Sequence, residues 1–324
     1  MVNSSETLKT PILFLVFNRP SCTEKVFKAI AAARPTKLYV AADGARQNNP
    51  GEADLCAEVR AIATKVDWDC ELKILFREKN LGCRLAVSSA IDWFFYHEEE
   101  GIILEDDCLP LSCFFEYAAS MLERYRHSEK VMHVGGINYQ PVDQTLNTSY
   151  YFSKIPHVWG WATWRRAWKC YDRDLSGLRK FVSSGKWREL ELDIDVCYYW
   201  IRCFYSTLIG KVDTWDYQWC FSILSHDGLS ITPGRNLVEN IGFGVDATHT
   251  KNGNSPALSM CIGSEFWKLS EPSKIEVNSM RDRYTYRHVY NVKADSCFFL
   301  FRWKKRLRKR LKTKRMLKEI IKGN

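Results

Sequence analysis

The chain has 324 residues, of which 46% are hydrophobic, so it is long enough for one large or two ordinary domains and too apolar to be disordered. Its formal net charge is 47 − 38 = +9. Residues 302–322 alone hold twelve Lys or Arg and one acid, which leaves 35 bases and 37 acids elsewhere, or −2. This near-neutral body argues against a protein built around a basic nucleic-acid-binding face, and the charge excess belongs to a C-terminal tail.

The cysteines and the N-terminal segment indicate the cell compartment in which the protein is expected. None of the 12 cysteines forms a C-x-x-C pair, so a zinc site is disfavoured and reduced, mostly buried thiols are expected. Residues 12–17 are too short and badly flanked for a signal peptide, and no run reaches the ~18 apolar residues of a membrane span. We therefore expect a cytoplasmic protein.

Strand and helix patterns alternate through the first 110 residues. The predicted strands are residues 11–17, 37–42, 70–76 and 101–104, and the predicted helices are residues 21–33, 49–66 and 80–97. Strands separated by helices predict parallel βαβ units, hence an open sheet covered by helices.

The second half is less regular and rich in tryptophan. We predict strands at 131–137 and 229–232 and a helix at 193–209. A second predicted helix follows the segment 215–219 and ends at residue 225, and residues 157–164 form an aromatic segment that a glycine interrupts. Residues 236–250 read as a polar loop. No internal repeat or low-complexity linker precedes the tail at 297–324.

Polar residues follow three of the predicted strands. They are Asn18-Arg19, Asp43-Gly44 and Glu105-Asp106-Asp107, and the carboxyl ends of parallel strands share one ligand-binding edge. Three adjacent acids repel one another, and Mg²⁺ or Mn²⁺ with oxygen ligands would compensate their charge. The alternative is a solvated acidic turn, but a buried strand leads into the triplet and favours a cation site.

Two more residues of this half have either a structural role or a role in ligand binding. Arg84 follows Gly82 at a predicted helix start, where a guanidinium and backbone N–H groups can face a diphosphate; a surface arginine is as plausible. Asp43 can accept hydrogen bonds from a base or ribose, or cap its own turn.

The second half offers candidates for the other substrate. Asp216 lies between Trp215 and Tyr217, which suits a general base, although it also precedes an apolar run as a helix N-cap would. His249 ends the polar loop and is a candidate metal or phosphate contact, although a lone histidine is more often structural. Trp159 and Trp161 can stack on sugars or pack in the core.

Four segments together resemble glycosyltransferases of the GT-A fold over about residues 10–250. They read PILFLVFNRP, YVAADGAR, REKNLGCRLA and GIILEDDCLPLSCFFEYA. The last contains an acid-rich "DXD" segment and is similar to the N-acetylglucosaminyltransferase I family and related bacterial transferases. The resemblance implies an α/β GT-A domain, mostly a parallel open sheet covered by helices, over residues 1–296. It has a nucleotide-binding half at 10–110 and an acceptor half at 111–255.

The resemblance also implies roles within a metal-dependent, inverting transferase that uses a nucleotide-sugar donor, favouring UDP. Asp107 would bind Mn²⁺ or Mg²⁺ directly, and Glu105 and Asp106 would contact the donor's ribose and sugar. The remaining implied contacts are Asn18, Arg19, Asp43 and Arg84 for the nucleotide, Asp216 as base, His249 for metal or diphosphate, and Trp159, Trp161 and Trp215 for the acceptor.

This sequence departs from the eukaryotic pattern in two ways. It begins without a membrane anchor, which suggests a bacterial-type cytoplasmic enzyme, and it reads Trp-Asp-Tyr-Gln-Trp at 215–219 instead of two adjacent acids between tryptophans. The second departure leaves the assignment of the base open.

The basic tail predicts an amphipathic helix. Leu300, Trp303, Leu307 and Leu311 share a stripe at helical spacing among basic residues, the composition of a helix on an anionic membrane. We expect peripheral binding to the inner face of the cell membrane, which suits a glycan or lipid-linked acceptor in surface polysaccharide synthesis. An RNA- or DNA-binding tail and a disordered solvated tail are the alternatives.

Two other functions use the same features. A nucleotidyltransferase or phosphoester hydrolase would use the same acids without needing the Trp-rich half. A nucleic-acid-binding protein would use the tail and leave the acid triplet unexplained, so we expect no specific nucleic-acid partner. The donor sugar, acceptor and linkage stay open.

Overall fold

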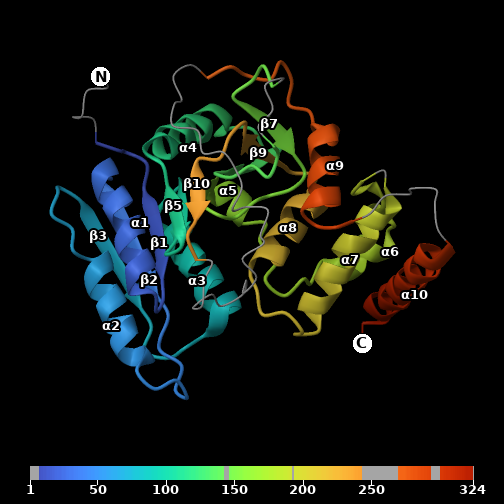
Figure 1. Ribbon diagram of the computed structural model, residues 1–324, viewed down its shortest axis with the longest axis horizontal. Helices are drawn as coiled ribbons and strands as arrows, with labels where there is room; N and C mark the ends of the chain where they lie inside the picture. The colour runs from blue at the N-terminus through green and yellow to red at the C-terminus, as the bar shows by residue number, and fades with distance from the viewer. Residues whose placement is uncertain (1–6, 142–145, 192, 243–268, 293–299, 324) are drawn as a thin grey trace. The chain divides into compact units, whose positions relative to one another are not determined.

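The computed structural model describes residues 7–141, 146–191, 193–242, 269–292 and 300–323. Two compact units form, each from two segments of the chain (Figure 1). Unit 1 comprises Met1–Lys169 and Leu229–Val277, and unit 2 comprises Cys170–Gly228 and Asn278–Asn324. This division differs from the predicted one, because the chain leaves unit 1 after residue 169 and returns to it at residue 229.

Unit 1 contains an eight-stranded sheet in the order β3-β2-β1-β4-β8-β6-β9-β7. β3, β2, β1 and β4 are parallel, β8 is antiparallel to β4 and β6, β9 is parallel to β6, and β7 is antiparallel to β9. The predicted mostly parallel α/β sheet is confirmed, with β8 and β7 reversed. The strands are β1 (Ile12–Val16), β2 (Lys37–Ala42), β3 (Glu71–Phe76), β4 (Glu100–Glu105), β6 (Val131–Gly135), β7 (Tyr150–Ser153), β8 (Trp161–Trp164) and β9 (Leu229–Pro233).

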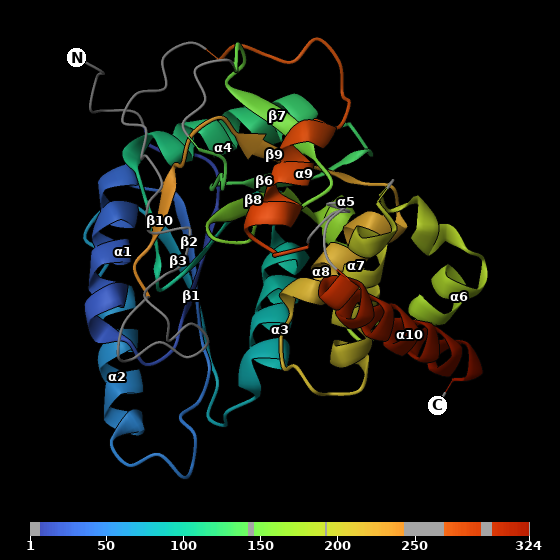
Figure 2. The same ribbon diagram turned by 45° about the vertical axis from the view of Figure 1, so that its right-hand side comes forward.

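Helices cover both faces of the parallel part of this sheet, which explains why its inner strands are continuous apolar runs. Figure 2 shows α1 (Pro20–Ala33) and α2 (Glu52–Ala63) on one face and α3 (Gly82–His97) on the other. Phe14 of β1 packs in the same core cluster as Val26 of α1 and Val59 of α2. On the opposite face the rings of Tyr39 and Phe94 are 4.9 Å apart, edge to face.

A two-stranded ribbon is added at the carboxyl end of β4. β5 (Cys108–Pro110) pairs antiparallel with β10 (Val238–Asn240), so part of the predicted loop 236–250 is a strand. The sequence did not indicate it, because a three-residue strand has too little pattern. α4 (Ser112–Tyr125), which was also not predicted, and α5 (Arg165–Trp168) complete the helices of unit 1.

Unit 2 is helical and rich in aromatic side chains. The Trp200 ring stacks on Phe204 at 5.6 Å, and its Nε1 donates to Tyr286 Oη at 3.0 Å. α10 packs against α7 and α6, and Arg310 Nε bonds Asp195 Oδ1 at 2.9 Å. The helices are α6 (Leu178–Ser183), η1 (Lys186–Glu189), α7 (Ile194–Leu208), α8 (Asp216–Ser225), α9 (Ser279–His288) and α10 (Leu300–Lys322).

Two further findings bear on the sequence expectations. Among the helices of the described residues, none is long and apolar enough to cross a membrane. The ten cysteines in the same part of the chain are free thiols, and five of them are buried, as small apolar side chains often are.

Candidate functional site

The carboxyl ends of β1, β2 and β4 meet at one edge of the sheet. β1 lies between the other two, with Val16 opposite Ala42 and Leu15 opposite Glu105. The residues that follow these strands therefore emerge side by side. The structure thus brings the segments at 18–19, 43–44 and 105–107 together.

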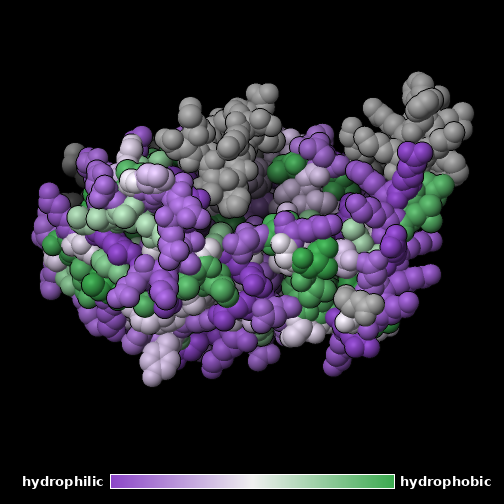
Figure 3. Space-filling view, turned by 90° about the horizontal axis from the view of Figure 1, so that it is seen from below, coloured by the Kyte–Doolittle hydropathy of each residue, from purple (hydrophilic) through white to green (hydrophobic). Residues whose placement is uncertain are grey.

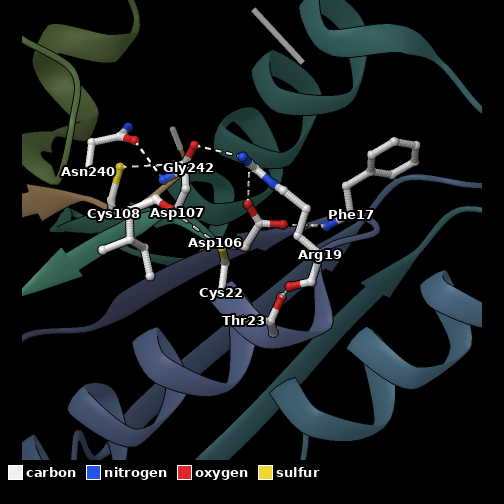
Figure 4. A network of polar contacts seen from close by, with 10 residues as sticks. Phe17, Arg19, Cys22, Thr23, Asp106, Asp107, Cys108, Asn240 and Gly242 are labelled. Atoms are coloured by element: carbon white, nitrogen blue, oxygen red, sulfur yellow. Dashed lines mark hydrogen bonds and ion pairs between the residues drawn. The ribbon is translucent and has the colours of Figure 1, made fainter. Parts of the chain in front are cut away.

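Arg19 joins the two aspartates of the acid triplet. Its Nη1 donates to Asp107 Oδ2 at 2.9 Å, and its Nη2 donates to Asp106 Oδ1 (Figure 4). The Arg19 carbonyl accepts the backbone N–H of Thr23 at 3.0 Å and its hydroxyl at 2.8 Å, which fixes the first turn of α1. In this structure Arg19 provides positive charge beside Asp106 and Asp107, and the expected Mg²⁺ or Mn²⁺ stays a prediction.

The two aspartates differ in environment. Asp106 is 2% exposed and also accepts the backbone N–H of Phe17 at 3.2 Å. Burial raises the pKa of Asp106 to about 6, against the attraction of Arg19, and repulsion from Asp107 adds to the rise. The Asp107 side chain is 17% exposed. Asp107 is therefore the more accessible of the two carboxylates to a ligand.

The β5–β10 ribbon holds the residues after Asp107 in place. The backbone N–H of Ile241 donates to the Asp107 carbonyl at 2.8 Å, and the Cys108 thiol lies 3.5 Å from Asp107 Oδ1. Gly242 passes so close that a Cβ there would lie 2.4 Å from Asp107 Oδ2 and 2.8 Å from Arg19 Nη1. The chain after β10 thus lies against the Arg19–Asp107 pair (Figure 4).

Asp43 adopts the capping role that the sequence left open. Its Oδ1 accepts the N–H groups of Gly44 and Leu81, both at 2.9 Å, and its Oδ2 accepts that of Gly82 at 3.1 Å. The carboxylate thus ties the end of β2 to the start of α3. Burial raises the pKa of Asp43, although these hydrogen bonds oppose the rise. Gly44 has no room for a side chain, because its Cβ would lie 2.4 Å from the Lys79 carbonyl carbon.

Asn18 belongs to a polar cluster that sequence reasoning missed. Its Nδ2 donates to Glu52 Oε1 at 2.8 Å, and the same carboxylate accepts Arg46 Nε at 3.0 Å and Asn49 Nδ2 at 3.0 Å. Hydrogen bonding from Arg46 lowers the pKa of Glu52 to about 2. The Arg46 guanidinium also lies over the Phe17 ring at 5.4 Å. The sequence shows Glu52 only as an acid in the first turn of a helix, so hydrogen bonds to it from two separate loops could not be predicted.

The other predicted nucleotide contacts lie nearby in the chain. Glu105 ends β4 and is partly exposed. Arg84 lies in the first turn of α3, where its carbonyl accepts the Ser88 hydroxyl at 2.7 Å. His249 lies outside the described residues, so its predicted role stays a prediction.

The tryptophans divide between packing and partial exposure. Trp161 is fully buried in β8, with its ring stacked on His133 at 5.1 Å, which is the core-packing alternative and leaves no face for a sugar. Trp159 is partly buried against the core, 5.9 Å from the Tyr139 ring. In unit 2, Trp215 is buried and its carbonyl accepts the Tyr171 hydroxyl at 3.1 Å.

Asp216 is the first residue of α8 in unit 2. Its Oδ1 accepts the Thr214 hydroxyl and the backbone N–H of Tyr217, the latter at 2.8 Å. The side chain is half-buried. The N-cap alternative is therefore wrong, because Trp215 is the N-cap of α8 and Asp216 is the residue after it. A half-buried carboxylate can act on a substrate proton, and this role of Asp216 stays a prediction.

The acid triplet meets only part of what a divalent cation needs. Carboxylate oxygens are the donors that Mg²⁺ and Mn²⁺ prefer. Yet no group of three or more His, Cys, Asp or Glu within the described ranges is placed to hold a metal. Arg19 already bridges both aspartates. Asp106 and Asp107 therefore fit a metal ion only when Arg19 has released them.

No model of a known protein family matches this chain, and no curated protein does. Solved structures do show similarity to it, among them the following three. A UDP-glucose pyrophosphorylase complexed with UDP-glucose is 11% identical, with 45% of this chain and 62% of that chain covered, at a TM-score of 0.26. An apo-UDP-glucose pyrophosphorylase is 11% identical, with 50% and 79% covered, at 0.30. A UTP-bound UGPase from Acinetobacter baumannii is 9% identical, with 77% and 92% covered, at 0.36.

The chain spans less than two thirds of the first of these structures, 62% of its length. At identities of 9–11% and TM-scores of 0.26–0.36, the similarity decides neither the fold family nor the activity. The residues at the sheet edge are therefore the features that indicate a function.

Proposed function

We propose that the protein is a nucleotide-sugar-dependent glycosyltransferase of the GT-A fold. The observation that carries the proposal is the grouping of Arg19, Asp106 and Asp107 where the central parallel strands β1 and β4 end. Ligands of open α/β sheets bind beyond this edge. A guanidinium and a pair of carboxylates there provide both signs of charge for a nucleoside diphosphate and its counter-ion.

The donor is proposed to be a UDP-sugar. Arg19 and Arg84 would interact with the diphosphate. Glu105, Asp106 and Asp43 would contact the nucleoside and sugar, as the GT-A resemblance implies. Mn²⁺ or Mg²⁺ held by Asp107, with Asp106 beside it, would supply the positive charge that neutralises the diphosphate leaving group. Arg19 has to give up its bonds to these carboxylates for such an ion to bind, and a released Arg19 would be available to phosphate oxygens.

The acceptor is proposed to be a glycan or a lipid-linked glycan. Asp216 would take the proton of the acceptor hydroxyl as its oxygen attacks the anomeric carbon from the face opposite the leaving group, which inverts the configuration. Asp216 is half-buried, which suits a general base, and its two hydrogen-bond donors hold Oδ1 in a fixed position.

Donor binding is tested with Asp107→Asn. UDP with Mn²⁺ should raise the Tm of the wild-type protein, because a ligand that binds only the folded state stabilises it. Asp107→Asn should lose most of this shift, since the accessible carboxylate has become a neutral amide. Asp69→Asn, an exposed acid of unit 1, is the matched control and should keep the shift. An unchanged shift in Asp107→Asn would rule out the site.

The reaction class is tested by products. Release of UDP from a UDP-sugar supports a transferase, whereas pyrophosphate formation from UTP and a sugar 1-phosphate supports the nucleotidyltransferase alternative, which the same acids would serve. The two assays use the same protein preparation, so inactivity in the first with activity in the second overturns the proposal.

The role of Asp216 is tested with Asp216→Asn. Transfer to an acceptor should fall by about 10²-fold or more, the usual contribution of a general base. The UDP-dependent Tm shift should remain, because donor binding does not use this residue. Asp213→Asn, an exposed acid three residues earlier, is the control. Transfer at the wild-type rate by Asp216→Asn would exclude it as the base.

A further inference from the structure

α10 presents two different faces. Thr313 and Ile320 are 0% and 3% exposed, and Arg202 Nη1 of α7 donates to Thr313 Oγ1 at 3.3 Å. These two residues are seven positions apart, so they lie on one side of the helix. This side is part of the packing of unit 2, and the helix is held there by Arg310 as well, through its bond to Asp195.

The outward face carries hydrophobic and basic residues together. Leu307, Leu311, Lys314, Lys318 and Ile321 are all exposed, the three apolar ones at 40%, 55% and 42%. At 100° per residue they fall within a sector of about 80°, centred about 130° from the buried Thr313 and Ile320. We call these five residues the outward stripe.

The surroundings of the outward stripe are also basic. Arg308, Lys309, Lys312 and Lys322 are exposed and make no ion pair with another described side chain. Glu319 is the one acid of residues 302–322, and it bonds Tyr205 Oη and Arg315 Nε, the latter at 3.1 Å. Arg179 of α6 lies beside the end of the helix, with its Nη1 3.2 Å from a Cβ built on Gly323.

The exposed hydrophobic residues of the outward stripe are few and are separated from one another. On the face drawn in Figure 3, hydrophilic side chains predominate and hydrophobic ones occur in small patches among them. Within the outward stripe, three apolar side chains and two lysines share one face of the helix at helical spacing. This is the arrangement of a helix that lies in a bilayer interface, with apolar side chains among the acyl chains and basic ones at the headgroups.

We propose that the outward stripe binds the surface of an anionic phospholipid bilayer. A surface of one sign attracts anionic headgroups, and the apolar side chains select a lipid over a nucleic acid, because phosphate backbones offer them nothing to bury in. The inference is independent of the proposed transferase activity, since it concerns only unit 2.

The test is flotation of the full chain with vesicles. Wild-type protein should float with vesicles that contain phosphatidylglycerol and not with phosphatidylcholine alone. Two double variants separate the contributions: Leu307→Ser/Leu311→Ser removes apolar side chains, and Lys314→Glu/Lys318→Glu reverses charges. Each should reduce the bound fraction at least fivefold. Because these residues are exposed, the Tm of the variants should match that of the wild-type chain.

Lys25→Glu/Lys65→Glu makes the same charge change at exposed positions of unit 1 and should bind vesicles as the wild type does. Equal loss in this control would mean that net charge, and not the stripe, drives binding, which overturns the proposal. Full binding by Leu307→Ser/Leu311→Ser would also overturn it. A shift of duplex DNA or RNA without vesicle binding would assign the face to nucleic acid instead.

Discussion

At the scale of single residues, Arg19 decides how the acid triplet works. It satisfies Asp106, which is 2% exposed, and removing it leaves a buried carboxylate unpaired at a cost of about 3–5 kcal/mol. The same bonds occupy the two aspartates that are proposed to bind Mn²⁺ or Mg²⁺. The proposal therefore makes Arg19 a competitor of the metal as well as a stabilising residue.

Arg19→Gln separates these two effects. The variant should have a lower Tm without metal and should bind Mn²⁺ alone at least tenfold more tightly than the wild type, measured by calorimetry without nucleotide. Mn²⁺ should then restore much of the lost Tm. Arg235→Gln, an exposed arginine of unit 1, should change neither value. Equal or weaker Mn²⁺ binding by Arg19→Gln would show that Arg19 does not compete with metal.

At the scale of elements, the short β5–β10 ribbon leads the chain directly to Asp107 and Arg19. Gly242 follows β10 and lies against Asp107 and Arg19, where a Cβ would be 2.4 Å and 2.8 Å from their side-chain atoms. A methyl group would push these side chains aside without breaking the pairing of Val238–Asn240 with Cys108–Pro110.

Gly242→Ala should therefore weaken binding of UDP with Mn²⁺ by about tenfold, while the Tm of the free protein changes little. Gly177→Ala is the matched control, because a Cβ there meets no atom closer than 3.3 Å. Calorimetric titration with UDP and Mn²⁺ gives both affinities. Unchanged affinity in Gly242→Ala would mean that the ribbon does not contact the nucleotide site.

The central strands of the sheet could be predicted from the sequence, whereas the β5–β10 pairing could not. β1, β2 and β4 were predicted because each is an apolar run between helices, and their shared edge followed from parallel connections. The pairing of β10 with β5 could not be predicted, since it joins three-residue segments about 130 positions apart with no pattern of their own. Glu52 was missed for a similar reason: its partners Asn18 and Arg46 come from two separate loops.

For some single residues the sequence allowed both a structural and a functional role, and only their contacts in the fold decide between the two. Asp43 caps a helix that starts 39 positions later, and Trp161 packs on His133, 28 positions earlier in the chain. Local sequence describes the type of residue and its strand or helix, whereas these partners depend on how distant segments come together.

At the scale of the whole molecule, buried histidines make stability depend on pH. Burial lowers the pKa of His133 and of His157 to about 3, and the His133 ring Nε2 lies 3.0 Å from the His157 carbonyl oxygen. The pKa of an unfolded histidine is about 6.5, so between these values the unfolded chain binds more protons. The free energy of unfolding should therefore fall as pH falls below about 6.5.

The fall should reach about 1.4 kcal/mol per pH unit for each histidine, measured by urea unfolding at a series of pH values. His133→Gln should remove up to half of this dependence between about pH 6 and 5, whatever its effect on stability at neutral pH. His127→Gln, at an exposed position, should keep it. An identical slope in His133→Gln would contradict the assignment.

The chain passes from one unit to the other at residues 169–170, 228–229 and 277–278. During synthesis, β9 therefore emerges only after the helices α6 to α8 have been made. β7 cannot pair with β9 before then. α10, which packs on α7, is made after all the other helices of the described residues. Neither unit is a contiguous fragment that can be expressed by itself, and removing α10 would strip α7 of a packing partner. Point substitutions, rather than truncations, are the way to dissect this protein.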